Sequence, residues 1–250
     1  MHTVQLLLKT TEYDCQVMEK RFHAVSHVHN VLVKHAKWCL KRLGHDKAYQ
    51  SAKADYCTLL KKDEDKLSKN EKTLKKELSK TMKTHLLQHG LSESGFQSYI
   101  KVCAKQFRKC LSSQQVQKEA TRVWKGVEAV LYGDGKDIHF KKYRDFNTIC
   151  GKTNTNGAKF HKETMTMEWL GLEIKCKLPK EDLYVTEALD ADISYCEIKR
   201  MMFPNGWHYL VVNSFKLKDD EDDSWWAGLI GGIVAIFWGV LTMILAYKYS

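Results

Sequence analysis

The chain has 250 residues and a formal net charge of +10, and its eight cysteines form no Cys-x-x-Cys pair. The length allows one or two domains, and the cysteine spacing excludes the usual zinc modules and a compact disulfide framework. The first 218 residues hold 39 of the 40 basic and 25 of the 30 acidic residues, which gives them a net charge of +14. Such an excess indicates a polyanionic partner, either nucleic acid or an anionic membrane surface, with solubility alone as the plain alternative.

The N-terminal half reads as one strand followed by helices. Residues 3–10 predict the strand. From residue 11 to Gly44, apolar residues recur every three or four positions, which is typical of an amphipathic helix. Ser112 and Gln115 have the spacing of a capping box at the start of a later helix. We therefore expect four or five helices over residues 11–132, in the segments 11–44, 47–62, 62–90, 92–111 and 112–133.

The segment 62–90 places its leucines along one helix face among many lysines. Such a helix could contact nucleic acid. A charged run of this kind is more commonly a solvated helix face, and we favour that interpretation.

After Gly133 the sequence favours strands. Six short segments have strand character, and turn residues such as Asn156-Gly157 and Gly171 separate them. An Asn-Gly pair between alternating runs is a strong hairpin signal. The pattern predicts a small barrel whose first strand is separated from the rest by a helical insertion. The six segments are 137–143, 158–162, 164–170, 172–178, 194–203 and 207–217.

Residues suited to catalysis or metal binding are few. His23 and His27 lie one helical turn apart, but no glutamate completes a His-Glu-x-x-His motif. The sequence offers no convincing nucleophile, no glycine-rich phosphate loop and no pair of carboxylates in an apolar setting. We therefore expect no metal site and no cofactor.

Two stretches, 99–110 and 139–160, interleave basic and aromatic residues. Lysine and arginine neutralise phosphates, aromatic faces stack on unpaired bases, and asparagine can bond base edges. The alternative is an ordinary barrel with aromatic residues in its core and lysines on its surface. The candidate nucleic-acid-binding residues in these stretches are Lys101, Lys105, Arg108, Lys109, Phe140, Lys141, Lys142, Tyr143, Arg144, Asn147, Lys152 and Asn154.

Residues 1 to about 214 resemble the N-terminal half of the TnpB, or OrfB-type transposase, family of transposon-encoded, RNA-guided DNA nucleases. Six pieces carry the resemblance by their order and spacing: "VQLLLKT", "RFHAVSHVHN", "YIKVCAKQFRKCLSSQQVQKEATRVWKGVEAVL", "HFKKY", "MEWLGLEIK" and "FPNGWHYLVV". The resemblance implies a wedge-type β-barrel with a helical recognition domain inserted after its first strand. It also implies that these two domains hold a guide RNA and read a short DNA motif.

The resemblance adds further candidate contacts at the start of one helix. The family's Ser-Ser-x-x-x-Gln-Gln faces DNA, and here the second glutamine is a lysine, which puts the base preference in doubt. Phe140, Lys141 and Lys142 match the family's Phe-Lys-Lys. The added candidates are Ser112, Ser113, Gln117, Lys118 and Arg122.

After the last wedge strand the family continues into a RuvC-like nuclease with a zinc module, and this sequence does not. The acidic run Asp219–Asp223 lies at that junction, but acids in a linker lack the rigid placement of a two-metal site. We therefore expect no nuclease activity, and no enzyme.

The segment Trp225–Tyr247 carries no charge and is long enough to cross a bilayer, with aromatic residues at both ends. It predicts a membrane helix that contacts lipid. Gly228 and Gly232 form a Gly-x-x-x-Gly motif that could pair two copies into a homodimer. The expected localisation is a single-pass C-terminal anchor with the N-terminal domain in the cytoplasm.

Together these features predict an α+β protein that binds guide RNA and flanking duplex DNA. One alternative is a membrane-tethered DNA-binding regulator that uses no RNA, and another is an inert transposon remnant. The expected parts are a first wedge strand (1–10), a helical recognition domain (11–132), the rest of the wedge (133–217), an acidic linker (218–224) and a transmembrane helix (225–247).

Overall fold

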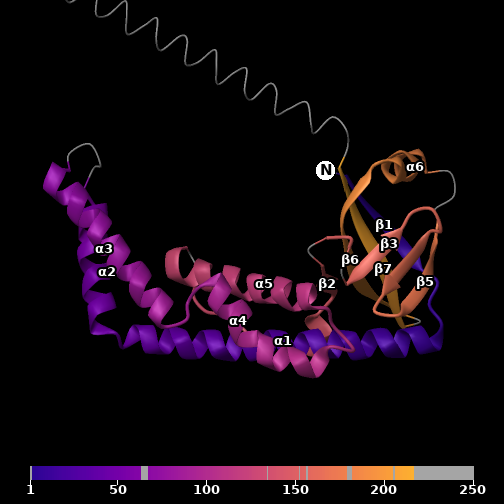
Figure 1. Cartoon of the computed structure of the whole chain (residues 1–250), viewed down its shortest axis with the longest axis horizontal. Coiled ribbons are helices and arrows are strands. Elements are labelled where there is room, and N and C mark those ends of the chain that lie inside the picture. The colour runs from indigo at the N-terminus through magenta and orange to yellow at the C-terminus, as the bar shows by residue number, and fades with distance from the viewer. Residues whose placement is uncertain are drawn as a thin grey trace, which may run out of the picture.

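The computed structural model describes residues 2–62, 67–133, 135–151, 153–155, 157–178, 182–204 and 206–216, which form an α+β fold (Figure 1). The predicted α+β class is thus confirmed. The elements in chain order are β1 (His2–Leu8), α1 (Glu12–Gly44), α2 (Lys47–Leu60), α3 (Lys69–Gln88), α4 (Glu93–Ala104), η2 (Lys105–Phe107), α5 (Ser113–Tyr132), η3 (Tyr143–Asp145), β2 (Thr148–Cys150), β3 (Ala158–His161), β4 (Thr166–Trp169), β5 (Leu172–Lys177), α6 (Leu183–Asp190), β6 (Asp192–Phe203) and β7 (Gly206–Lys216).

The long helix α1 organises the molecule. Figure 1 shows the sheet over its N-terminal end, the α2–α3 hairpin rising from its other end, and α4 and α5 along its middle. A capping box between Thr11 and Asp14 starts the helix. The predicted apolar stripe, from Met18 to Cys39, is buried and joins one core that continues into the sheet, α4 and α5. α1 is therefore the scaffold on which both halves are placed.

The strands form one antiparallel sheet in the order β2-β6-β7-β1-β5-β4-β3. β1 pairs with β7 on one side and β5 on the other, so the first strand of the chain is the central strand. The predicted closed barrel is wrong, because the end strands β2 and β3 do not pair and the sheet stays open. Strand number and alternation do not decide closure, which also requires the two end strands to meet in register.

Two pairs of neighbouring strands are joined by short connections, one of them at the Gly171 signal. β4 and β5 are joined through Leu170 and Gly171, which both have positive φ (46° and 77°), as a type I′ turn requires. β6 and β7 pair up to Phe203 opposite Gly206. The Asn156-Gly157 signal, in contrast, marks no hairpin, since β2 pairs with β6 and β3 pairs with β4.

Three segments differ from the sequence prediction, and one of them is β2 (Thr148–Cys150), which no predicted strand covers. Residues 137–143 form no strand, because they lie along α1, where the Asn30 side chain exchanges two hydrogen bonds with the Lys141 backbone (2.9 and 3.0 Å). An amide side chain thus replaces a strand partner there. The short helix α6, which begins at the Asp182 N-cap, was not predicted.

The predicted membrane anchor is not supported. Within the described ranges, none of the helices combines the length and the apolar character needed to cross a bilayer. The linker 218–224 and the segment 225–247, with Gly228 and Gly232, lie outside the described residues. The expected transmembrane helix and single-pass localisation are therefore corrected.

Candidate nucleic-acid interface

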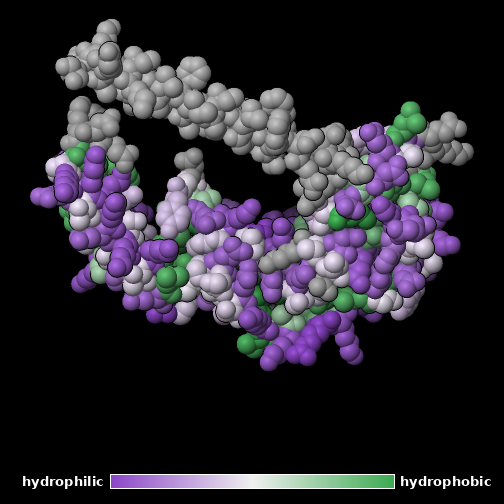
Figure 2. Space-filling model, turned by 45° about the horizontal axis from the view of Figure 1, so that its top comes forward, coloured by the Kyte–Doolittle hydropathy of each residue, from purple (hydrophilic) through white to green (hydrophobic). Residues whose placement is uncertain are grey.

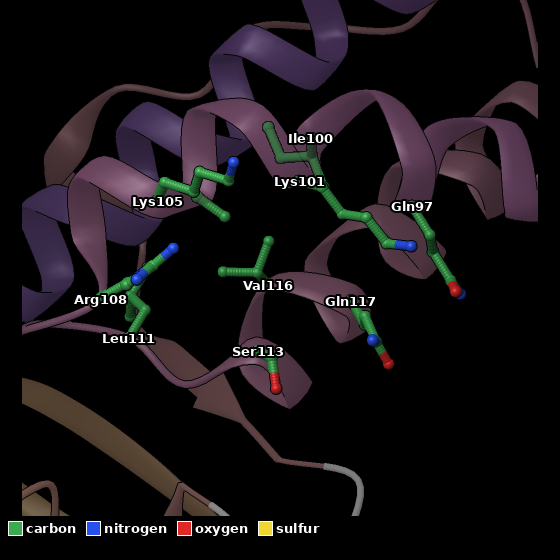
Figure 3. Close-up of a pocket in the computed structure, with 10 residues that line it drawn as sticks. Gln97, Ile100, Lys101, Lys105, Arg108, Leu111, Ser113, Val116 and Gln117 are labelled. Carbon is green, nitrogen blue, oxygen red and sulfur yellow. The ribbon is translucent and has the colours of Figure 1, made fainter.

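A groove between α4–η2 and the start of α5 brings together candidates from different parts of the sequence (Figure 3). Its cavity volume is about 320 Å³. The floor is apolar and consists of Ile100, Leu111 and Val116, which are all buried. Lys101, Lys105 and Arg108 lie on one rim, and Ser113 and Gln117 lie on the other. We refer to it as the α4–α5 groove.

Helical spacing places the cations on one rim. Lys101, Lys105 and Arg108 are four and three residues apart, so they project from the same face of α4 and η2. All three are exposed, and in the described part of the chain none of them forms an ion pair with a carboxylate. Three uncompensated positive charges beside an apolar floor are suited to a phosphate with an attached base or sugar.

The other rim is fixed by the cap of α5. The Ser112 hydroxyl accepts a hydrogen bond from Gln115 N (3.3 Å), and Gln115 Oε1 accepts from Ser112 N (2.9 Å) and from Trp169 Nε1 (3.2 Å). The Ser112 side chain thus caps the helix terminus, and the Gln115 side chain ties that terminus to the sheet. Ser113 and Lys118 are exposed, and Gln117 is half-buried in the groove. These three residues, rather than Ser112, are accessible to a ligand.

Arg122 belongs to a polar network below the surface. It donates to Glu119 (2.9 Å), whose other carboxylate oxygen lies 2.6 Å from Nδ1 of His29. It also donates to Sγ of Cys150 (3.2 Å), and that thiol donates to Glu197 (3.0 Å). Burial, followed by the hydrogen bond to Glu197, raises the pKa of the Cys150 thiol to about 12. This network joins α1, α5 and the sheet. Arg122 is therefore engaged in contacts within the protein.

The candidate residues of the second basic stretch, 139–160, lie in different surroundings. Phe140, Lys141 and Lys142 are exposed beside α1. Tyr143 stacks on His23 with ring centroids 3.6 Å apart and donates its hydroxyl hydrogen to Glu19. The Phe140 ring is therefore accessible to a ligand, whereas the Tyr143 ring is already stacked on His23.

Arg144 and Asn147 line a separate groove of about 430 Å³ at the sheet edge. Lys199, Met201, Met202 and Trp207 also line it. Sequence reasoning did not select the two methionines and the tryptophan, because hydrophobic strand residues are usually buried. Arg200 also lines this groove, but its side chain is buried and is held by Glu19, Tyr143 and the carbonyl of Phe146.

Asn154, a further candidate, is not a free surface group. The Asn154 side chain donates to the carbonyl of Phe160 (3.1 Å) and accepts from its N–H (2.8 Å), which fixes the loop before β3. Lys152 lies outside the described residues. Lys109 is exposed at the end of η2.

The histidine pair of α1 takes part in ring contacts. His23 stacks on Tyr143, and His27 lies 5.4 Å from Phe107 between ring centroids. Among the described residues no group of three or more His, Cys, Asp or Glu side chains is arranged to hold a metal ion.

Comparisons with known proteins add no identification: neither a protein-family model nor a curated protein sequence matches the chain. The transposase family suggested by the sequence pattern therefore receives no support from them.

Proposed function

We propose that the chain binds nucleic acid through the α4–α5 groove, with structured RNA as the first candidate ligand. The groove supports this proposal because it joins Lys101, Lys105 and Arg108 to an apolar floor, and in the described part of the chain none of the three forms an ion pair with a carboxylate. Phosphates would bind at the cationic rim, and a base or sugar would cover the apolar floor. The sequence resemblance to RNA-guided nucleases selects structured RNA from among the polyanions.

The test is a binding titration of the full chain with a structured RNA over a series of salt concentrations. The variant K101Q/K105Q/R108Q removes three positive charges from the rim. Because each lost phosphate contact removes about 0.7 to 0.9 from the slope of log affinity against log salt, that slope should fall by about two. The affinity itself should fall by roughly tenfold or more at moderate salt.

A matched control removes the same charge elsewhere. Lys72, Lys76 and Lys80 lie on α3 and are exposed, so K72Q/K76Q/K80Q changes the net charge equally without touching the groove. This control should retain most of the affinity. Equal losses in both variants would show that binding follows net charge alone, and would remove the groove as the site.

A second candidate function is the binding of duplex DNA without RNA. It is favoured by Ser113, Gln117 and Lys118, which present accessible polar groups and a positive charge near the start of α5. Duplex DNA in the same titration separates the candidates: tighter binding of the duplex than of the RNA would favour this second function. The absence of DNA cleavage stays a prediction, tested by incubating the RNA-loaded protein with target DNA and Mg²⁺.

A further inference from the structure

The exposed side of α1 carries positive charge over a long distance. Between Glu19 and Asp46 the helix contains no carboxylate. Side chains seven residues apart share a helix face after two turns, and Lys20, Lys34 and Lys41 fit this spacing. We call this surface the α1 face; its exposed members are Lys20, His27, Lys34, Trp38, Lys41 and His45.

The loop 137–143 extends the positive charge beside the α1 face. It runs along α1 through three contacts: Asp137 with Lys37 (2.6 Å), Lys141 with Asn30, and Tyr143 with His23. Exposed Lys141 and Lys142 are therefore held next to the helix. Asp137 is paired with Lys37, so its charge does not neutralise the lysines of the face.

An exposed aromatic side chain lies within this charged surface. Trp38 is 53 % exposed, and the Arg42 guanidinium lies 4.5 Å from its ring centroid. The His35 ring is stacked with the Trp38 ring at 6.1 Å between centroids, and His35 is itself stacked on Tyr99 at 3.6 Å. The stack supports the indole while leaving half of its surface in solvent. The exposed part of the indole and the Arg42 guanidinium over its ring can pack against an unpaired base, because bases stack on arginine planes as well as on aromatic rings.

We propose that the α1 face is a second nucleic-acid-binding surface, a track that binds successive phosphates of a single-stranded segment and packs one base against Trp38 and Arg42. Lys20 and Lys41 are about 31 Å apart along the axis at 1.5 Å per residue, long enough for several nucleotides. The inference rests on the proposed nucleic-acid binding and adds a site on α1, a helix that does not line the groove.

The composition of the face favours nucleic acid over a lipid surface. A helix that binds in a membrane interface needs a broad apolar side, and from residue 20 to residue 45 Trp38 is the only large apolar side chain that is strongly exposed. Solubility alone explains the lysines of the α1 face less well than those of α3, because α3 also contains Glu71 and Glu77 among its lysines. Figure 2 shows hydrophilic side chains covering the α2–α3 hairpin as well, so that hairpin is the natural control.

The experiment measures binding of the full chain to a mixed-sequence single-stranded RNA. The variant K20Q/K34Q/K41Q should bind roughly tenfold more weakly than wild type, with the salt slope lower by about two. K72Q/K76Q/K80Q on α3 should bind nearly as wild type does. Trp38→Ala should weaken binding of the RNA but leave binding of heparin, a polyanion without bases, unchanged. Circular dichroism and thermal unfolding verify that each variant is folded.

Several outcomes would overturn the inference. Unchanged affinity and slope in K20Q/K34Q/K41Q would do so, and so would an equal loss in the α3 control. A variant that loses binding to anionic lipid vesicles but keeps its RNA affinity would assign the face to a membrane. If K101Q/K105Q/R108Q weakens RNA binding while K20Q/K34Q/K41Q does not, the proposed function stands and only this inference fails. If wild type binds no nucleic acid, both fail.

Discussion

Arg200 and Arg144 lie in the same sheet-edge groove, but the structure uses them differently. Arg200 is buried and donates to Glu19, to the carbonyl of Phe146 and to the carbonyl of Tyr143, while Arg144 is exposed. Removing one partner of a buried ion pair leaves the other charge uncompensated. We expect Arg200→Met to lower the free energy of unfolding by about 3 kcal/mol, and Arg144→Met by no more than about 0.5 kcal/mol. Denaturant unfolding of both variants measures this, and similar values would contradict the assignment.

Because the pKa of the Cys150 thiol is raised, we expect the protein to lose stability at alkaline pH. Burial and Glu197 raise its pKa from the ordinary 9.0 to about 12 in the folded protein. The unfolded chain therefore ionises this thiol first, and its contribution to stability is present below pH 9 and is lost as the pH rises to about 12. We expect Cys150→Ala to flatten the fall in unfolding free energy across this window. Cys57→Ala, at an exposed position, should leave it unchanged, and identical curves for the two variants would refute the prediction.

The capped start of α5 is an element whose structure followed from its sequence. The spacing of Ser112 and Gln115 predicted the capping box, and the structure confirms it. Ser112→Ala should cost about 1 kcal/mol of stability, because it leaves a helix N–H without its acceptor. Ser113→Ala, one residue later and exposed, should cost much less. Thermal unfolding compares the two, and an equal effect would mean that the cap adds no stability.

Other elements could not be predicted from local patterns. Residues 137–143 alternate like a strand, yet their partner is the Asn30 side chain on α1, which is more than 100 positions away in sequence. Tyr143 and Asn154 had the residue types of nucleic-acid contacts. Only the fold reveals that Tyr143 stacks on His23 and that Asn154 bonds the Phe160 backbone. Local sequence indicates which groups are available, and tertiary contacts decide which are already occupied.

For the whole molecule, the order of one strand, helices and further strands was visible in the sequence, but the closure of the sheet was not. The short end strands β2 and β3 leave the sheet open, and the alternation of their residues carries no information about that. Only part of the α4–α5 groove could be predicted from the sequence. Its cations were selected from the basic stretch, whereas the apolar floor and the α1 face appear only once α1, α4 and α5 pack together.

The most direct measurement is the affinity of the full chain for a structured RNA as a function of salt, for wild type and for K101Q/K105Q/R108Q. Nucleic-acid binding through the α4–α5 groove predicts a steep decrease of wild-type affinity with salt. It also predicts that the variant binds roughly tenfold more weakly, with a slope lower by about two. A variant that matches wild type in both affinity and slope would contradict the proposed site. Wild-type protein that binds no nucleic acid even at low salt would contradict the proposed function.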